Sequence, residues 1–137
     1  MAKKADVQIF PLLPAKGGKA PIHYSRAGRA GNILFIAGLC SRDPEQNYKT
    51  VGSTLTEQME VIFARIRGVC EEAGTSLENA VDVTVYLNDI RNFAELRDNL
   101  PKYFSAPPPP ATIIESTLIR PEEFAEIKVT VMIPDKD

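Results

Sequence analysis

The polar residues best suited to chemistry lie in the last third of the chain, between Pro107 and Pro134. Glu126 stands at the start of an extended run that ends at Ile133, where its carboxyl group could face a cleft for a small molecule. A carboxyl group that is partly removed from water can exchange protons near neutral pH, as general acid–base chemistry requires. The alternative is a glutamate at the rim of a sheet, paired with a lysine such as Lys128.

Three positions in the first third of the chain could line the same cleft. The phenol of Tyr24 could hydrogen-bond a substrate, or the ring could be buried in a core or an interface. Backbone N–H groups near Gly38 could receive a carboxylate, because glycine permits a close approach. Cys40 follows closely, but nothing next to it in sequence identifies a base, so a catalytic thiolate is disfavoured.

Composition limits the classes of function. The 137 residues are 44% hydrophobic, which fits one domain over residues 1–137 that folds without a metal or a disulfide. The net charge of -2 provides no strong field for nucleic acid or for an anionic membrane. Cys40 and Cys70 follow no metal spacing, so reduced thiols and no metal are expected. Without a signal-like or membrane-length apolar run, we expect a cytoplasmic protein.

Periodicity predicts the elements that position these residues. Extended runs cover 6–10, 23–27, 32–38, 80–87, 111–118 and 126–133, with a hairpin turn at 28–31 and a surface loop at 41–52. An amphipathic helix covers 53–73, with a capping-box spacing between Thr54 and Glu57 and a terminating Gly74. A second, shorter helix covers 92–104, and Pro101 invites a local break in it.

This order predicts an α+β fold in which a mixed six-stranded sheet carries both helices on one face. The other face has mixed polarity, so we expect copies of the same chain to cover it, with ligand sites at the joins. The residues expected on that face are Thr84, Tyr86, Thr112, Ile114 and Thr130. We also expect the last two extended segments to lie side by side, so that Thr112 and Glu126 look into one hollow between protomers.

Several strings resemble one known family over nearly the whole chain, from about Pro21 to Pro134. They are Tyr24 before a strand that ends in Gly38, EEAGTSLENAV at 71–81, VTVYLNDIRNFAELRDNLPKYF at 83–104, and the final PPPA and EIKV. Together they are similar to the Rid family of reactive intermediate deaminases, also called the YjgF-like family. The resemblance implies a chorismate-mutase-like fold, a homotrimer with intersubunit clefts, no cofactor and a small carboxylate substrate.

The resemblance also suggests roles for individual residues. The deaminase branch has a Pro-Ala-Arg string whose arginine clamps the substrate carboxylate, and here the string ends in Thr112. A hydroxyl lacks the charge and the second parallel donor of a guanidinium, so Arg26 or Arg42 would have to substitute. The acidic residue of the family matches Glu126 if one residue is inserted in the preceding turn. The expected site is thus catalytic Glu126 with substrate-binding Tyr24, Gly38, Cys40, Arg42, Thr112 and Ile114.

The strings HYSRAG at 23–28 and SRDP at 41–44 look more like the 2-aminomuconate deaminase branch. The expected function is therefore hydrolytic release of ammonia from a small carboxylated enamine or imine, with an aminomuconate-like compound as one candidate. The alternative is a non-catalytic protein of the same family that binds a small metabolite or regulates. A ribonuclease is disfavoured, because the chain is net negative and lacks a basic aromatic platform.

Overall fold

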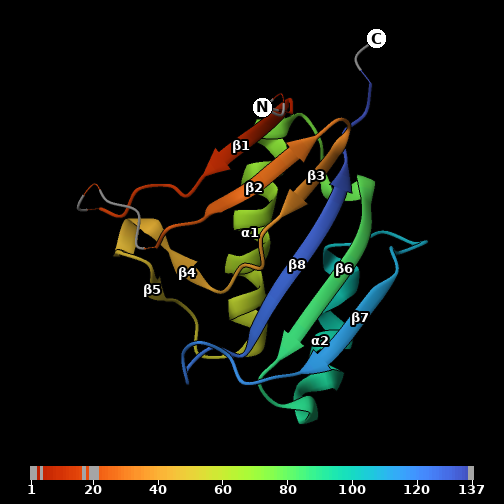
Figure 1. Cartoon of the computed structure of the whole chain (residues 1–137). Helices are drawn as coiled ribbons and strands as arrows, with labels where there is room; N and C mark the ends of the chain where they lie inside the picture. Colours follow the sequence, from red (N-terminus) through yellow and green to blue (C-terminus); the bar gives the residue numbers. More distant parts are fainter. Residues whose placement is uncertain (1–2, 4, 17, 19–21, 136–137) are drawn as a thin grey trace.

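The computed structural model describes residues 3, 5–16, 18 and 22–135. Within these residues, six strands form the main sheet, and β4 and β5 pair separately (Figure 1). In chain order, the elements are β1 (Val7–Pro11), β2 (Ser25–Ala30), β3 (Ile33–Ile36), β4 (Arg42–Asp43), η1 (Pro44–Gln46), β5 (Lys49–Thr50), α1 (Leu55–Ala73), η2 (Leu77–Asn79), β6 (Ala80–Leu87), η3 (Ile90–Asn92), α2 (Phe93–Asn99), η4 (Leu100–Lys102), β7 (Ala111–Glu115) and β8 (Ala125–Met132).

The sheet runs β1-β2-β3-β8-β6-β7, and only the β6–β7 pair of this order is parallel. A parallel pair needs a crossover connection, and α2 lies within the one between β6 and β7. Both helices lie behind the sheet in the view of Figure 1. The predicted α+β fold, with a mixed six-stranded sheet and two helices on one face, is therefore confirmed.

Helix α1 forms where its periodicity and its caps predict it. The side chain of Thr54 accepts a hydrogen bond from the Glu57 N–H at 3.1 Å, and Gly74 ends the helix with a φ of 82°. The apolar stripe is buried against the sheet, where Met59, Ile62 and Phe63 have no exposed surface. Neither α1 nor any other described helix is long and apolar enough to cross a membrane.

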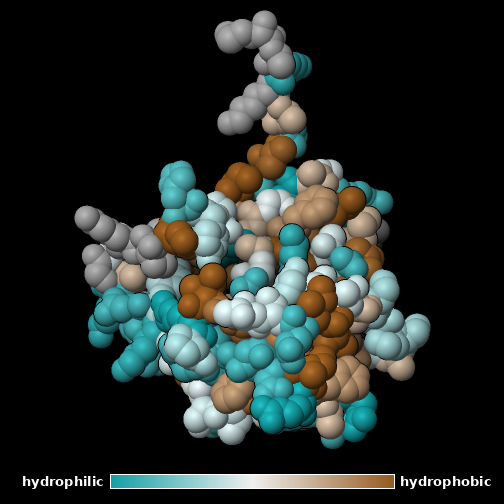
Figure 2. All heavy atoms as spheres, turned by 60° about the horizontal axis from the view of Figure 1, so that its bottom comes forward, coloured by the Kyte–Doolittle hydropathy of each residue, from teal (hydrophilic) through white to brown (hydrophobic). Residues whose placement is uncertain are grey.

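Strand β8 lies in the middle of the sheet and divides it into a core face and an open face. Ile127, Val129 and Val131 are buried beneath the helices, while Glu126 and the alternate residues after it face the other way. The open face also exposes large apolar side chains, namely Val7, Ile9, Ile33, Phe35, Ile114 and Met132. Figure 2, which brings the lower edge forward, shows apolar patches at the surface among hydrophilic groups.

Two local predictions were wrong. The β2–β3 turn lies at Gly31 and Asn32, not at 28–31, because Gly31 supplies the positive φ of 59° and Gly28 pairs within the sheet. The segment 41–52 is not simply a surface loop, since β4 and β5 pair within it. Ser41 and Tyr48 are buried there, at 0% and 3% exposure, so this segment forms part of the wall around the site.

The expectation that the last two strands are neighbours was also wrong, because β6 lies between β7 and β8. Buried residues alternate with more exposed ones along the eight residues of β8, and this strand lies inside the sheet. The shorter β7, of five residues, lies at an edge of the sheet. The registers still place both strands' polar residues on one face: Tyr86 pairs with Ile114 on one side and with Glu126 on the other. Thr112 and Glu126 thus share the open face, but about 10 Å of sheet width separates their strands.

Candidate functional site

A pocket of about 260 Å³ lies where β3 ends and β8 begins, and we call it the Glu126 pocket. The segment after β3 is held against β8 by a two-way backbone pair, Leu39 N–H to Ile127 O at 2.9 Å and Ile127 N–H to Leu39 O at 3.0 Å. Five predicted site residues line it, Tyr24, Gly38, Cys40, Arg42 and Glu126, together with Leu12, Ile22, Leu39, Tyr48, Arg65, Ile119 and Arg120.

The carboxyl group of Glu126 lies directly against Gly38. A Cβ atom added at position 38 would be 2.5 Å from Glu126 Oε2 and 3.1 Å from its Cδ. Real side chains do not pack that closely, so only glycine at this position leaves room for the carboxylate as it stands. The glycine that the sequence marks as permitting a close approach therefore makes space for a protein carboxylate.

Cys40 contributes a neutral thiol to the pocket. Its Sγ donates a hydrogen bond to Glu126 Oε1 at 3.4 Å. Burial raises the pKa of the Cys40 thiol, and the negative charges of Glu123 and Glu126 raise it further. A thiol in these surroundings stays protonated at neutral pH, which argues against a thiolate nucleophile. Among the described residues, no group of three or more His, Cys, Asp or Glu side chains could hold a metal ion.

Arg42 lines the pocket but is committed to Glu123. Its Nε and Nη2 donate to the two carboxylate oxygens of Glu123 at 2.9 and 3.0 Å, and the Glu123 side chain is fully buried. Burial favours the neutral guanidinium, but the hydrogen bonds and the negative charge of Glu123 outweigh it and raise the pKa of Arg42. The fork that would clamp a substrate carboxylate is thus already filled.

Arg26, the other sequence-predicted substitute, does not line the Glu126 pocket. It donates to both carboxylate oxygens of Glu72 on α1 and to Pro11 O at 2.6 Å. It borders a larger hollow of about 500 Å³ along α1, which lacks Gly38 and Glu126. The Arg26–Glu72 pair therefore joins β2 to the helix layer.

The connection between β7 and β8 is held in place by the fully buried Gln58 of α1. Its amide nitrogen donates to Gly52 O at 3.1 Å and to Glu122 O at 2.9 Å, and its amide oxygen accepts from Phe124 N–H at 2.8 Å. Sequence reasoning missed this residue because it lies within an apolar helix stripe. Gln58 fixes the connection that carries Arg120 into the pocket.

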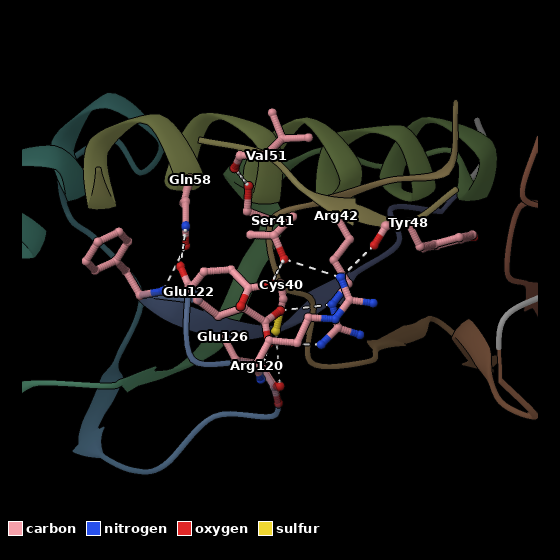
Figure 3. Close-up of polar contacts among 12 residues, drawn as sticks. Cys40, Ser41, Arg42, Tyr48, Val51, Gln58, Arg120, Glu122 and Glu126 are labelled. Carbon is pink, nitrogen blue, oxygen red and sulfur yellow. Dashed lines mark hydrogen bonds and ion pairs between the residues drawn. The ribbon is translucent and has the colours of Figure 1, made fainter. Parts of the chain in front are cut away.

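Three further polar residues of the pocket wall were not predicted from the sequence. Arg65 reaches it from α1, Arg120 from the connection after β7 and Tyr48 from the β4–β5 segment; Figure 3 draws Arg120 beside Cys40 and Glu126. For Arg120, the only signal in the sequence was its place in a loop that contains proline, since loops often carry binding groups. Arg65 carries no such signal, since in the sequence it resembles any charged residue on a solvated helix face.

Thr112 and Ile114 do not line the Glu126 pocket of the single chain. Both lie on β7 at the edge of the sheet and are exposed, Ile114 at 44%. The structure therefore brings together five of the seven predicted site residues, and it leaves the two β7 residues on the open face beyond β6.

Comparisons with known proteins agree with this architecture. A family model described as Endoribonuclease L-PSP matches residues 17–133. A RutC family protein of Pyrococcus abyssi is 33% identical over 105 residues, which cover 77% of this chain and 82% of that protein. A RutC family protein of Aquifex aeolicus is 38% identical over 92 residues, covering 65% and 72%.

Solved structures give the same result. RidA of the Antarctic bacterium Psychrobacter sp. superposes with a TM-score of 0.79 at 29% identity, over 92% of this chain and 99% of that one. A YjgF family member of Neisseria meningitidis gives 0.78 at 26% identity, over 96% and 98%. Because the family model matches residues 17–133, which is most of this chain, the chain belongs to the Endoribonuclease L-PSP family, which includes the RutC, YjgF and Rid proteins.

Proposed function

We propose that this protein is a deaminase that hydrolyses a small carboxylated enamine or imine and releases ammonia. The observation that carries the proposal is the Glu126 carboxyl group, which lines a small pocket against Gly38 and beside the neutral thiol of Cys40. Membership of a family that contains RidA supports the same reaction class. We place the reaction in the cytoplasm, as the sequence suggests.

The proposed chemistry needs one group that transfers protons and one that holds the substrate. The enamine takes a proton on carbon from the Glu126 carboxyl group and becomes an iminium ion. The oxygen of a water molecule then attacks the iminium carbon, and the Glu126 carboxylate accepts the proton that the water gives up. In the carbinolamine that results, the hydroxyl proton moves to the nitrogen, the C–N bond breaks, and ammonia leaves while the carbon keeps the oxygen as a carbonyl group. Tyr24 and the backbone near Gly38 shape the pocket.

We also propose that the working form is a homotrimer whose protomers meet at the open face. An exposed apolar region that includes Ile9, Phe35 and Met132 is typical of a surface that another chain covers. In such an assembly, Thr112 and Ile114 of a neighbouring copy could complete the cleft that the single chain leaves open. The two β7 residues would then act across the interface and not within one chain.

The second candidate is a binding or regulatory protein that keeps the pocket without the chemistry. Threonine at position 112, where the resemblance places an arginine, favours this reading because a hydroxyl cannot clamp a carboxylate bidentately. Glu126 would then be a polar wall residue.

An ammonia-release assay separates the two candidates. The full chain is mixed with 2-aminoacrylate generated in the assay, and separately with 2-aminomuconate. We expect release above the uncatalysed rate and a loss of about 100-fold or more in Glu126→Gln, because general acid–base groups typically supply that much. Glu78→Gln is the matched control, because Glu78 is exposed and does not line the Glu126 pocket; its rate of ammonia release should equal that of the parent. Ligand binding with no release from either substrate would favour the binding protein.

A further inference from the structure

The charges of the Glu126 pocket do not balance within the protein. Arg42 is neutralised by Glu123, but Arg65 and Arg120 face the same pocket with neutral partners only. In the part of the chain that the structure describes, neither has a carboxylate within ion-pair distance. Among the described residues that line the wall, Glu126 is the one remaining carboxylate, so these residues carry an excess of positive charge.

Each of the two guanidinium groups is anchored by one nitrogen. Arg65 Nη1 donates to Cys40 O at 2.8 Å, and Arg120 Nη1 donates to Tyr48 O at 2.8 Å and Thr50 Oγ1 at 3.3 Å. No hydrogen bond to a described residue uses Nε or Nη2 of either group. Those two nitrogens form the edge of a guanidinium that holds a carboxylate through parallel hydrogen bonds.

The anchor of Arg120 is built from unusual backbone. Asn47 and Tyr48 both have left-handed conformations, with φ of 55° and 59°, which are costly for residues other than glycine. The buried Tyr48 side chain helps to hold this conformation, since its hydroxyl donates to Leu13 O. The Tyr48 carbonyl is therefore fixed as an acceptor for Arg120, and the guanidinium is positioned before any ligand arrives.

We propose that Arg120 and Arg65 together bind the carboxylate of a small organic acid in the Glu126 pocket. A partly buried cation without a counterion is costly, and a carboxylate ligand supplies the missing charge. The pocket volume of about 260 Å³ in the single chain suits a small metabolite. This inference deepens the proposed function and rests on it for the identity of the site, but binding can be measured without turnover.

The test is isothermal titration of the full chain with 2-oxobutyrate, an unreactive acid of the product class. We expect Arg120→Gln and Arg65→Gln each to weaken binding at least 10-fold, because each removes charge-assisted hydrogen bonds. Arg120→Lys keeps the charge but lacks parallel donors, so it should weaken binding about 3- to 10-fold. Glu126→Gln should bind more tightly, since it removes a nearby negative charge. Arg91→Gln, at an exposed pair with Asp89, is the matched control and should change nothing.

Thermal melts of every variant establish that the fold is intact. The amide of the acid and inorganic phosphate serve as two further ligands: weak binding of both is expected, and binding as tight as that of the acid would overturn carboxylate recognition. Unchanged acid affinity in folded Arg120→Gln and Arg65→Gln, or no acid binding by the parent, would also refute the proposal. Acid binding through these arginines without ammonia release would instead refute only the deaminase. Ammonia release that survives in both variants would refute only this inference.

Discussion

Replacing Gly38 by alanine should disable the site without unfolding the protein. The new Cβ would stand 2.5 Å from Glu126 Oε2, which is about 0.9 Å short of ordinary contact. Gly38 has no positive φ, so its backbone accepts alanine, and the atoms in conflict belong to the far end of a flexible side chain. The Glu126 carboxyl group should therefore move by about 1 Å, while the sheet stays in place.

The expected changes in rate and in stability follow from this geometry. A 1 Å misplacement of a catalytic group can cost about 100-fold in rate, or about 2.7 kcal/mol of barrier. The free energy of unfolding should change by less than about 1 kcal/mol. Alanine lowers the entropy of the unfolded chain, which stabilises the folded protein by about 0.4 to 1 kcal/mol. The displaced Glu126 side chain destabilises it by about 0.5 to 1.5 kcal/mol, so the two contributions nearly cancel.

The assays are ammonia release and urea unfolding, run in parallel on Gly38→Ala and on a control. Gly28→Ala is the matched control, because its Cβ would meet only Ile9 Cδ1 at an ordinary 3.6 Å. Full activity in Gly38→Ala would refute the role given to the position of Glu126. A loss of stability well above 2 kcal/mol would instead show that the backbone takes up the strain.

Three further predictions concern the groups that hold the pocket. Gln58→Ala should lower the free energy of unfolding by about 3 kcal/mol in urea, since it leaves three backbone groups without partners; a loss below about 1 kcal/mol would contradict its role. Glu123→Gln should cost about 3 kcal/mol at pH 7, because it leaves the partly buried Arg42 without the carboxylate that neutralises it. Burial alone would raise the pKa of Glu123, but Arg42 outweighs it and holds that pKa below 4.5, so the folded state binds fewer protons than the unfolded state. The urea difference between parent and Glu123→Gln should therefore be complete above pH 4.5 and shrink as pH falls below it; a constant difference would refute the assignment. Burial raises the pKa of Cys70 to about 11 and also raises the pKa of Cys40. Neither thiol should therefore react quickly with a disulfide reagent at pH 7.5 until urea unfolds the protein. Fast labelling of Cys40 in the folded protein would contradict this prediction.

Local pattern was enough to predict the elements that bear the site. The stripe and caps of α1 and the alternation of β8 depend on neighbours in the sequence, and both elements formed where expected. Gly38 and Glu126 could also be proposed as site residues, because a glycine that ends one strand and a glutamate that starts another both match the pattern of the family that the chain resembles. The position of the hairpin turn could not be predicted from local pattern, because more than one glycine could form it; the turn lies at Gly31.

The tertiary structure alone decided which charges are free for a ligand. Arg42 is the arginine that sequence position favours, but Glu123, 81 residues away, fills its fork. Arg65 and Arg120 come from a helix and a loop, and only the packing of α1 against the β4–β5 segment and the β7–β8 connection brings them to one wall. Periodicity reports what each segment buries, whereas ion pairing and strand order depend on contacts between segments that are far apart in the chain. The sequence by itself therefore determined the layers and, with the family resemblance, pointed to Glu126, whereas the folded chain decided which cations lie around that carboxyl group.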